Sequence, residues 1–85
     1  MRSEEALVLI IKEYKRASSI HGPFKSAHEG YAIMLEEFDE LWDEIKQREP
    51  NVYSMEEEVV QIGAMALRFL VDICGDPTYA VPEND

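Results

Sequence analysis

The stretch from Tyr31 to Ile45 constrains the fold of this chain more than any other. Its large apolar side chains recur every three or four residues over four turns, which is the spacing of one face of a helix. Six carboxylates occupy the ten residues from 35 to 44. The pattern therefore predicts a helix with one face in a core and a dense acidic flank. The predicted core stripe is Tyr31, Met34, Leu35, Phe38, Leu41, Trp42 and Ile45.

Helix signals on either side of this stretch complete the first part of the chain. We expect a first helix from about Glu4 to Ala17, with Ser3 as its N-cap. The second helix is expected to begin after Ser26, because Ser26 and Glu29 form a capping-box pattern, and to end near Gln47. Glycine and proline at positions 22 and 23 should separate the two helices.

The third predicted helix begins with another capping box at Ser54 and ends near Cys74, with Gly75 as its C-cap. Apolar residues cover most of its circumference, which is typical of a central helix with neighbours on more than one side. Residues 76–85 contain two prolines and no periodicity, so we expect a loose C-terminal tail.

These patterns predict an all-α fold with a single helical domain over residues 1–75. Three helices with broad apolar faces leave more apolar surface than one small bundle can bury. Dimerisation into a four-helix-type or larger bundle would resolve this, so we expect a homodimer or homotetramer.

Charge and composition exclude some classes of function. Eight basic and eighteen acidic side chains give a formal net charge of −10, which argues against binding to a nucleic acid polymer. A nucleotide ligand stays possible, because a bound metal can supply positive charge. No apolar run reaches membrane-spanning length, so we expect no membrane partner. The single cysteine, Cys74, cannot form an internal disulfide, which favours a cytoplasmic setting.

The helical wheel divides the acidic run of the second helix. Glu37 and Glu40 stand at the edge of the predicted buried face, one turn apart. The third helix carries a polar stripe within one narrow sector, and a polar stripe on an apolar helix must face water or a polar cavity. If it faces Glu37 and Glu40, the cavity holds at least three carboxylates, a donor set that favours Mg²⁺ or Mn²⁺. The stripe is Glu58, Gln61, Met65, Arg68 and Asp72.

A plain structural interpretation stands beside this one. Glutamate-rich helices in acidic proteins are mostly just solvated surfaces. Arg68 could likewise pair with Asp72 one turn further on, in a surface ion pair that contributes little to stability.

The acidic residues resemble the signature of the MazG-like all-α nucleoside triphosphate pyrophosphohydrolases, relatives of the dimeric all-α dUTPases. That signature is E-E-x-x-E on one helix and E-x-x-D on the next. The residues from Glu36 to Glu40 match the first part fully, and those from Glu58 to Gln61 match the second except at its last position. The resemblance covers roughly Ser26 to Asp72, about half the chain. Family members usually continue into a fourth helix, which is not predicted here.

The resemblance implies specific roles. Metal ligands would be Glu37, Glu40 and Glu58, with Gln61 in the fourth place, where the family has a carboxylate. Mg²⁺ would be the cofactor, with Mn²⁺ as the alternative cation. Glu36 would help position the attacking water as a catalytic residue. A nucleoside triphosphate would be the substrate, hydrolysed to a monophosphate and pyrophosphate.

Few basic residues are available to hold the phosphates. Arg68 and Lys25 are the substrate-binding candidates that we select from a set that also includes Lys12, Lys15 and Arg16. The alternatives are a non-catalytic MazG-like helical oligomer and an acidic interaction protein. The sequence does not identify the base or the sugar.

Overall fold

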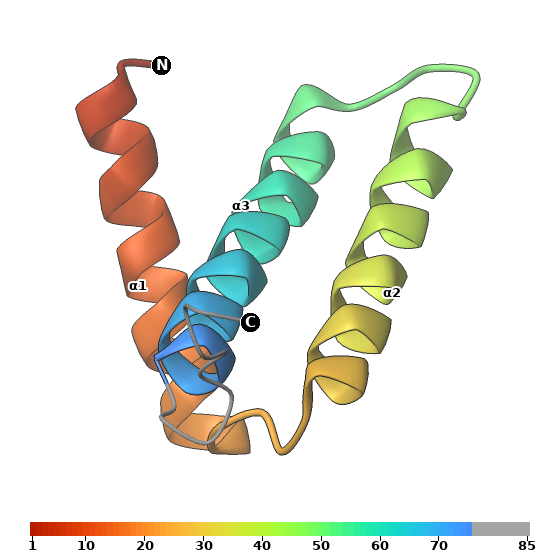
Figure 1. Cartoon of the computed structure of the whole chain (residues 1–85). Helices are drawn as coiled ribbons and strands as arrows, with labels where there is room; N and C mark the ends of the chain where they lie inside the picture. The colour runs from red at the N-terminus through yellow and green to blue at the C-terminus, as the bar shows by residue number, and fades with distance from the viewer. Residues whose placement is uncertain (76–85) are drawn as a thin grey trace, which may run out of the picture.

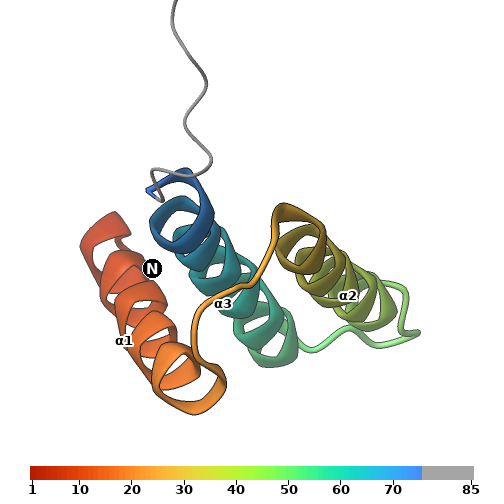
Figure 2. The ribbon, with the colours of Figure 1, turned by 60° about the horizontal axis from the view of Figure 1, so that its bottom comes forward.

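The computed structural model describes residues 1–75 and contains three long helices in this range. They are α1 (Ser3–His21), α2 (Ala27–Ile45) and α3 (Val52–Phe69). A π-helical turn, η1 (Leu70–Cys74), continues α3 to the end of the described chain. Figure 1 shows α3 lying between α1 and α2, and the view in Figure 2 shows the same order. The predicted all-helical, three-helix fold is confirmed, including the central place of the third helix. The predicted loose tail, 76–85, lies outside the described residues.

The helix boundaries follow local capping chemistry and differ from the prediction at two N-termini. Ser26 caps α2 as expected, because its Oγ accepts a hydrogen bond from the Glu29 backbone N–H at 3.0 Å. α3 begins earlier than predicted, because the side chain of Asn51 accepts from the N–H groups of Tyr53 and Ser54. Asparagine is as good an N-cap as serine, so Ser54 lies inside the helix.

The first helix also differs from its prediction at both ends. Its N-cap is Arg2, which makes no side-chain capping bond, and Ser3 is the first helical residue. The helix continues past Ala17 to His21, and it ends at Gly22, whose φ is 69°. That left-handed conformation suits glycine because it has no Cβ, so the glycine ends the helix as the sequence predicts.

The core lies along α3 rather than along the predicted stripe of α2. The buried apolar residues are few, and small side chains allow close helix contacts: Ala64 is fully buried, and a Cβ added at Gly63 would lie 2.8 Å from Ile10 Cδ1. The full set of buried apolar residues is Ala17, Phe24, Ala64, Met65 and Ile73.

The predicted burial of the α2 stripe is wrong for the single chain. Five of its seven members stay exposed, from 42% for Ile45 to 64% for Tyr31. The reason is Gly30, whose missing side chain lets the flank of α2 approach the Phe69 and Phe24 rings. That contact turns α2 so that its flank, with Gly30, Ile33 and Glu37, faces inward. The stripe that we expected in the core lies beside the contact with α3.

Gly30→Ala tests this close approach. A new Cβ would lie 2.6 Å from Phe69 Cδ2 and 3.1 Å from Phe24 Cδ2. Alanine elsewhere in a helix interior would stabilise by about 1 kcal/mol, whereas overpacking costs about 1–3 kcal/mol. We expect a net loss of about 1–2 kcal/mol in urea unfolding monitored by circular dichroism. A gain in stability would contradict the packing of α2 on α3.

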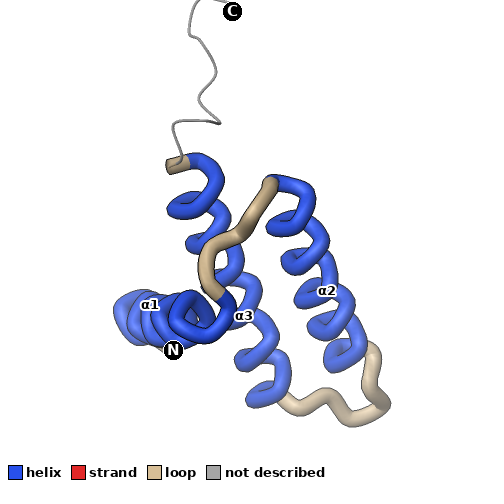
Figure 3. The backbone as a smooth tube through the Cα atoms, turned by 90° about the horizontal axis from the view of Figure 1, so that it is seen from below, coloured by secondary structure: helices blue, strands red, loops and turns tan. Residues whose placement is uncertain are grey.

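The connector between α1 and α2 crosses the C-terminal part of α3, as the tube in Figure 3 shows. Two contacts hold it there. Arg68 donates from Nη2 to the Gly22 carbonyl at 2.6 Å, and the Phe24 backbone N–H donates to Asp72 Oδ2 at 2.9 Å. These contacts fix the C-terminal end of α1 against α3, and Arg68 also lines the cleft described next. Within residues 1–75, none of the helices is long and apolar enough to cross a membrane.

Candidate metal centre and cleft

Three carboxylates from two helices converge at the contact between α2 and α3. α2 and α3 form a hairpin, so residues at equal heights from the connecting loop face each other. Glu40 lies about a turn and a half before the end of α2, and Glu58 about a turn and a half after the start of α3. One carboxylate oxygen from each of Glu37, Glu40 and Glu58 lies within 4.8 Å of the others. The predicted convergence of the two acidic motifs is therefore present.

Two of these carboxylates are partly withdrawn from solvent. One oxygen of Glu37 and one of Glu58 are buried without a hydrogen-bond partner. Burial, followed by the negative charges of Glu40 and Glu58, raises the pKa of Glu37 to about 7. Burial and the contact with Glu40 also raise the pKa of Glu58. A buried carboxylate oxygen without a donor is costly, and either a proton or a cation would relieve that cost.

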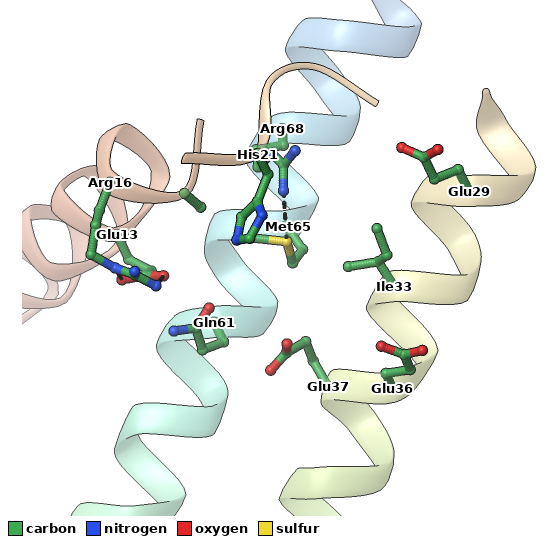
Figure 4. Close-up of a pocket in the computed structure, with 11 residues that line it drawn as sticks. Glu13, Arg16, His21, Glu29, Ile33, Glu36, Glu37, Gln61, Met65 and Arg68 are labelled. Atoms are coloured by element: carbon green, nitrogen blue, oxygen red, sulfur yellow. Dashed lines mark hydrogen bonds and ion pairs between the residues drawn. The ribbon is translucent and has the colours of Figure 1, made fainter. Parts of the chain in front are cut away.

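A cleft of about 290 Å³ opens beside the carboxylates. Figure 4 shows side chains from all three helices around it, with Glu37 reaching from α2 towards α3. It has acidic and basic parts, because Glu36 and Glu37 line it together with Arg16, His21 and Arg68. The remaining lining residues are Glu13, Ala17, Glu29, Ile33, Gln61 and Met65.

Arg68 is the most unusual residue of the cleft. It is only 3% exposed, yet no carboxylate of the described chain lies within ion-pair distance of it. Its guanidinium donates to the Gly22 carbonyl and to Met65 Sδ, stacks 4.1 Å from the centre of the Phe24 ring, and leaves Nε without a partner. The alternative of a surface pair with Asp72 is wrong, since Asp72 accepts from the Phe24 N–H instead. Among residues 1–75, no anion therefore neutralises the positive charge that Arg68 brings to the cleft.

The other basic residues differ in whether an acidic side chain pairs with them and in whether they line the cleft. The guanidinium of Arg16 donates from Nε to Glu13 Oε1 at 2.7 Å and pairs with the second oxygen as well. This pair holds the pKa of Glu13 below its ordinary value. His21 lines the cleft without such a partner among the described residues. Lys25 is exposed and does not line the cleft, so the structure does not bring it to the predicted site.

The Gln61 side chain lies towards α1. In Figure 4 it stands on the α1 side of α3, near Glu13, while Glu37 approaches from the α2 side. Gln61 also helps to lower the pKa of Glu13, which places its amide close to that carboxylate. Gln61 was predicted as the fourth metal ligand, whereas the roles of Glu13 and Gly22 were not predicted. Glu13 pairs with Arg16 three residues along α1, a spacing that the sequence contains. The contact of Arg68 with Gly22 depends on the path of the connector, which no local pattern encodes.

The comparisons with known proteins leave the family open. No protein-family model, curated protein or solved structure matches this chain.

Proposed function

We propose that this chain hydrolyses a nucleoside triphosphate to the monophosphate and pyrophosphate, with Mg²⁺ or Mn²⁺ held by Glu37, Glu40 and Glu58. The observation that carries the proposal is the convergence of these three carboxylates from two motifs of the signature, with buried oxygens that lack donors. Oxygen-only donor sets favour hard divalent cations. The cation, when bound, would neutralise phosphate charge and acidify a bound water.

The residues of the cleft supply the groups for phosphate binding and for general base catalysis. Arg68 supplies positive charge, Arg68 and His21 supply hydrogen-bond donors for phosphate oxygens, and Arg16 can join them if its pair with Glu13 opens. Glu36 lines the cleft next to Glu37 and is the candidate base for the attacking water. The water oxygen forms a bond to the α-phosphorus, and Glu36 takes its proton. The bond between the α-phosphorus and the bridging oxygen breaks, and pyrophosphate leaves with that oxygen.

A second candidate function rests on Gln61. Because residue 61 is a glutamine, the centre has three carboxylates and lacks the fourth that the signature provides, and the Gln61 amide lies towards Glu13. A non-catalytic helical oligomer of the same architecture, which binds a cation without hydrolysis, would fit this arrangement. For either function we propose a homodimer or homotetramer in the cytoplasm.

A pyrophosphate-release assay distinguishes the two candidates. With a panel of ribo- and deoxyribonucleoside triphosphates and added Mg²⁺ or Mn²⁺, the wild-type chain should release pyrophosphate. Glu37→Gln and Glu40→Gln should each lower the rate at least about 100-fold, as expected for loss of a ligand to a catalytic metal. Asp39→Asn is the matched control on α2, because Asp39 is exposed and outside the carboxylate cluster.

Each outcome of the assay favours a different function. Cation binding without hydrolysis of any nucleotide in the panel would favour the non-catalytic oligomer. If the chain neither binds a cation nor hydrolyses any nucleotide, both candidates are ruled out, and an acidic interaction protein is the function that remains. Equal loss of activity in Asp39→Asn and Glu37→Gln would mean that general charge, rather than the cluster, supports the reaction.

A further inference from the structure

One face of α2 has the periodicity of a helix-pairing surface and no partner within the described chain. It carries large side chains at alternating intervals of four and three residues, the heptad spacing of paired helices. We call these residues the α2 seam: Tyr31, Leu35, Phe38, Trp42 and Ile45. All five are more than 40% exposed, and the described fold leaves them uncovered.

We propose that the α2 seam is where a second copy of this chain docks, with the two α2 helices packed against each other around a two-fold axis. A two-fold interface places the same surface of both copies in contact, so the surface must be self-complementary. This inference names the surface for the self-association that the proposed function includes. It does not depend on metal binding or hydrolysis.

The charges of α2 favour a copy of the same chain over a basic partner. The positions that flank a heptad seam decide which charges meet across the interface. Here they hold Ala32, Met34, Leu41 and Lys46, and Asp39 is the only carboxylate among them. The other carboxylates of α2 lie on the remaining faces of the helix. A basic partner would be drawn to those faces, whereas the seam itself offers an apolar, nearly neutral strip.

The size of the seam also fits a dimer. A fully buried aromatic side chain contributes roughly 150–250 Å², and the three seam aromatics, Tyr31, Phe38 and Trp42, are about half exposed or more. With Leu35 and Ile45, the seam offers on the order of 500 Å² per chain, or on the order of 1,000 Å² for a pair, the lower limit for a specific interface. A shallow apolar hollow at Ala27, His28, Tyr31 and Phe69 extends the seam onto α3.

Trp42 provides a reporter without any mutation, because it is the only tryptophan and lies in the seam. In the dimer Trp42 is buried, so its fluorescence should be blue-shifted and poorly quenched by acrylamide. Dilution should shift the emission to the red over the same concentration range in which sedimentation equilibrium records the change from dimer to monomer. A monomer at all concentrations, or a dimer with a freely quenched Trp42, would overturn the proposal.

Two substitutions locate the interface. Phe38→Gln removes a central seam side chain from both copies and keeps a good helix former, so the dissociation constant should rise at least about 100-fold. Val8→Gln on α1 is the control, since Val8 is also half exposed and lies outside the seam. Unchanged association of Phe38→Gln, or equal weakening in Val8→Gln, would overturn the proposal. If Phe38→Gln unfolds, the dilution series on the wild-type chain decides alone.

This test is independent of the proposed chemistry. Phe38 is not a member of the carboxylate cluster and does not line the cleft. If the chain does not bind a cation, sedimentation equilibrium still measures whether it forms a dimer. A monomeric chain that still binds Mg²⁺ would overturn the seam and the proposed self-association, and it would leave the proposed metal site and hydrolysis untouched.

Discussion

Arg68→Ala should lower the free energy of unfolding by about 3 kcal/mol, the range for truncating a fully packed side chain that also makes buried hydrogen bonds. Arg68 is 3% exposed and makes three contacts that would be lost together: the hydrogen bond to the Gly22 carbonyl, the contact with Met65 Sδ and the stacking on Phe24. The Gly22 carbonyl would lose its charged donor, and the connector would lose one of its two ties to α3. Urea unfolding at fixed protein concentration, followed by circular dichroism, measures the loss.

Arg68→Met separates packing from charge. Methionine keeps much of the stem volume and removes the charge, so its loss should be smaller, about 1–2 kcal/mol, chiefly from the hydrogen bond to Gly22. Arg16→Met is the matched control, because the exposed pair with Glu13 should contribute less than about 1 kcal/mol. An Arg68→Ala variant as stable as the Arg16→Met control would show that the connector does not depend on this guanidinium.

The sequence was sufficient to predict the helices, and together with the motif resemblance it singled out the three glutamates that lie close together. Glu37 and Glu58 each lie on the flank of a clear helical period, so a wheel places them without knowledge of the tertiary structure. The antiparallel return from α2 to α3 follows from the short loop between them. These two facts allow the carboxylates to meet if the acidic flank of α2 faces α3, and the motif resemblance is what selected Glu37, Glu40 and Glu58 in advance.

The sequence was not sufficient to predict which side of α2 faces α3. Both the stripe through Phe38 and the flank through Gly30 and Ile33 are apolar enough to pack, and periodicity favours the stripe. In the single chain the flank packs against α3, because Gly30 lets Phe69 and Phe24 approach within contact distance. The burial of Arg68 could not be predicted either, because it depends on the connector that crosses α3. Gly22, the connector residue that Arg68 contacts, lies 46 positions before it in the sequence.

Raising the pH from about 4.5 through about 7 should destabilise the chain in the absence of divalent cations. The folded chain holds a proton on Glu37 up to a pKa of about 7, whereas the unfolded chain releases it near 4.5. Between these values the folded state binds more protons, so its stability falls as the pH rises. After discounting for partial exposure, we expect a loss of about 1–2 kcal/mol between pH 4.5 and pH 8. Thermal unfolding across this range, with EDTA present, records it.

Mg²⁺ should reverse this loss, because a cation and a proton compete for the same carboxylates. At pH 8 and ten times the dissociation constant, Mg²⁺ should stabilise by about 1.4 kcal/mol, and at pH 5 much of that gain should vanish. Glu37→Gln should remove most of the pH dependence and the response to Mg²⁺ together, while raising stability at pH 8. Glu57→Gln, an exposed neighbour of Glu58 outside the cluster, should retain both. A pH dependence that persists in Glu37→Gln would place the proton elsewhere, and an equal Mg²⁺ response in both variants would mean that the cation binds the acidic surface at large.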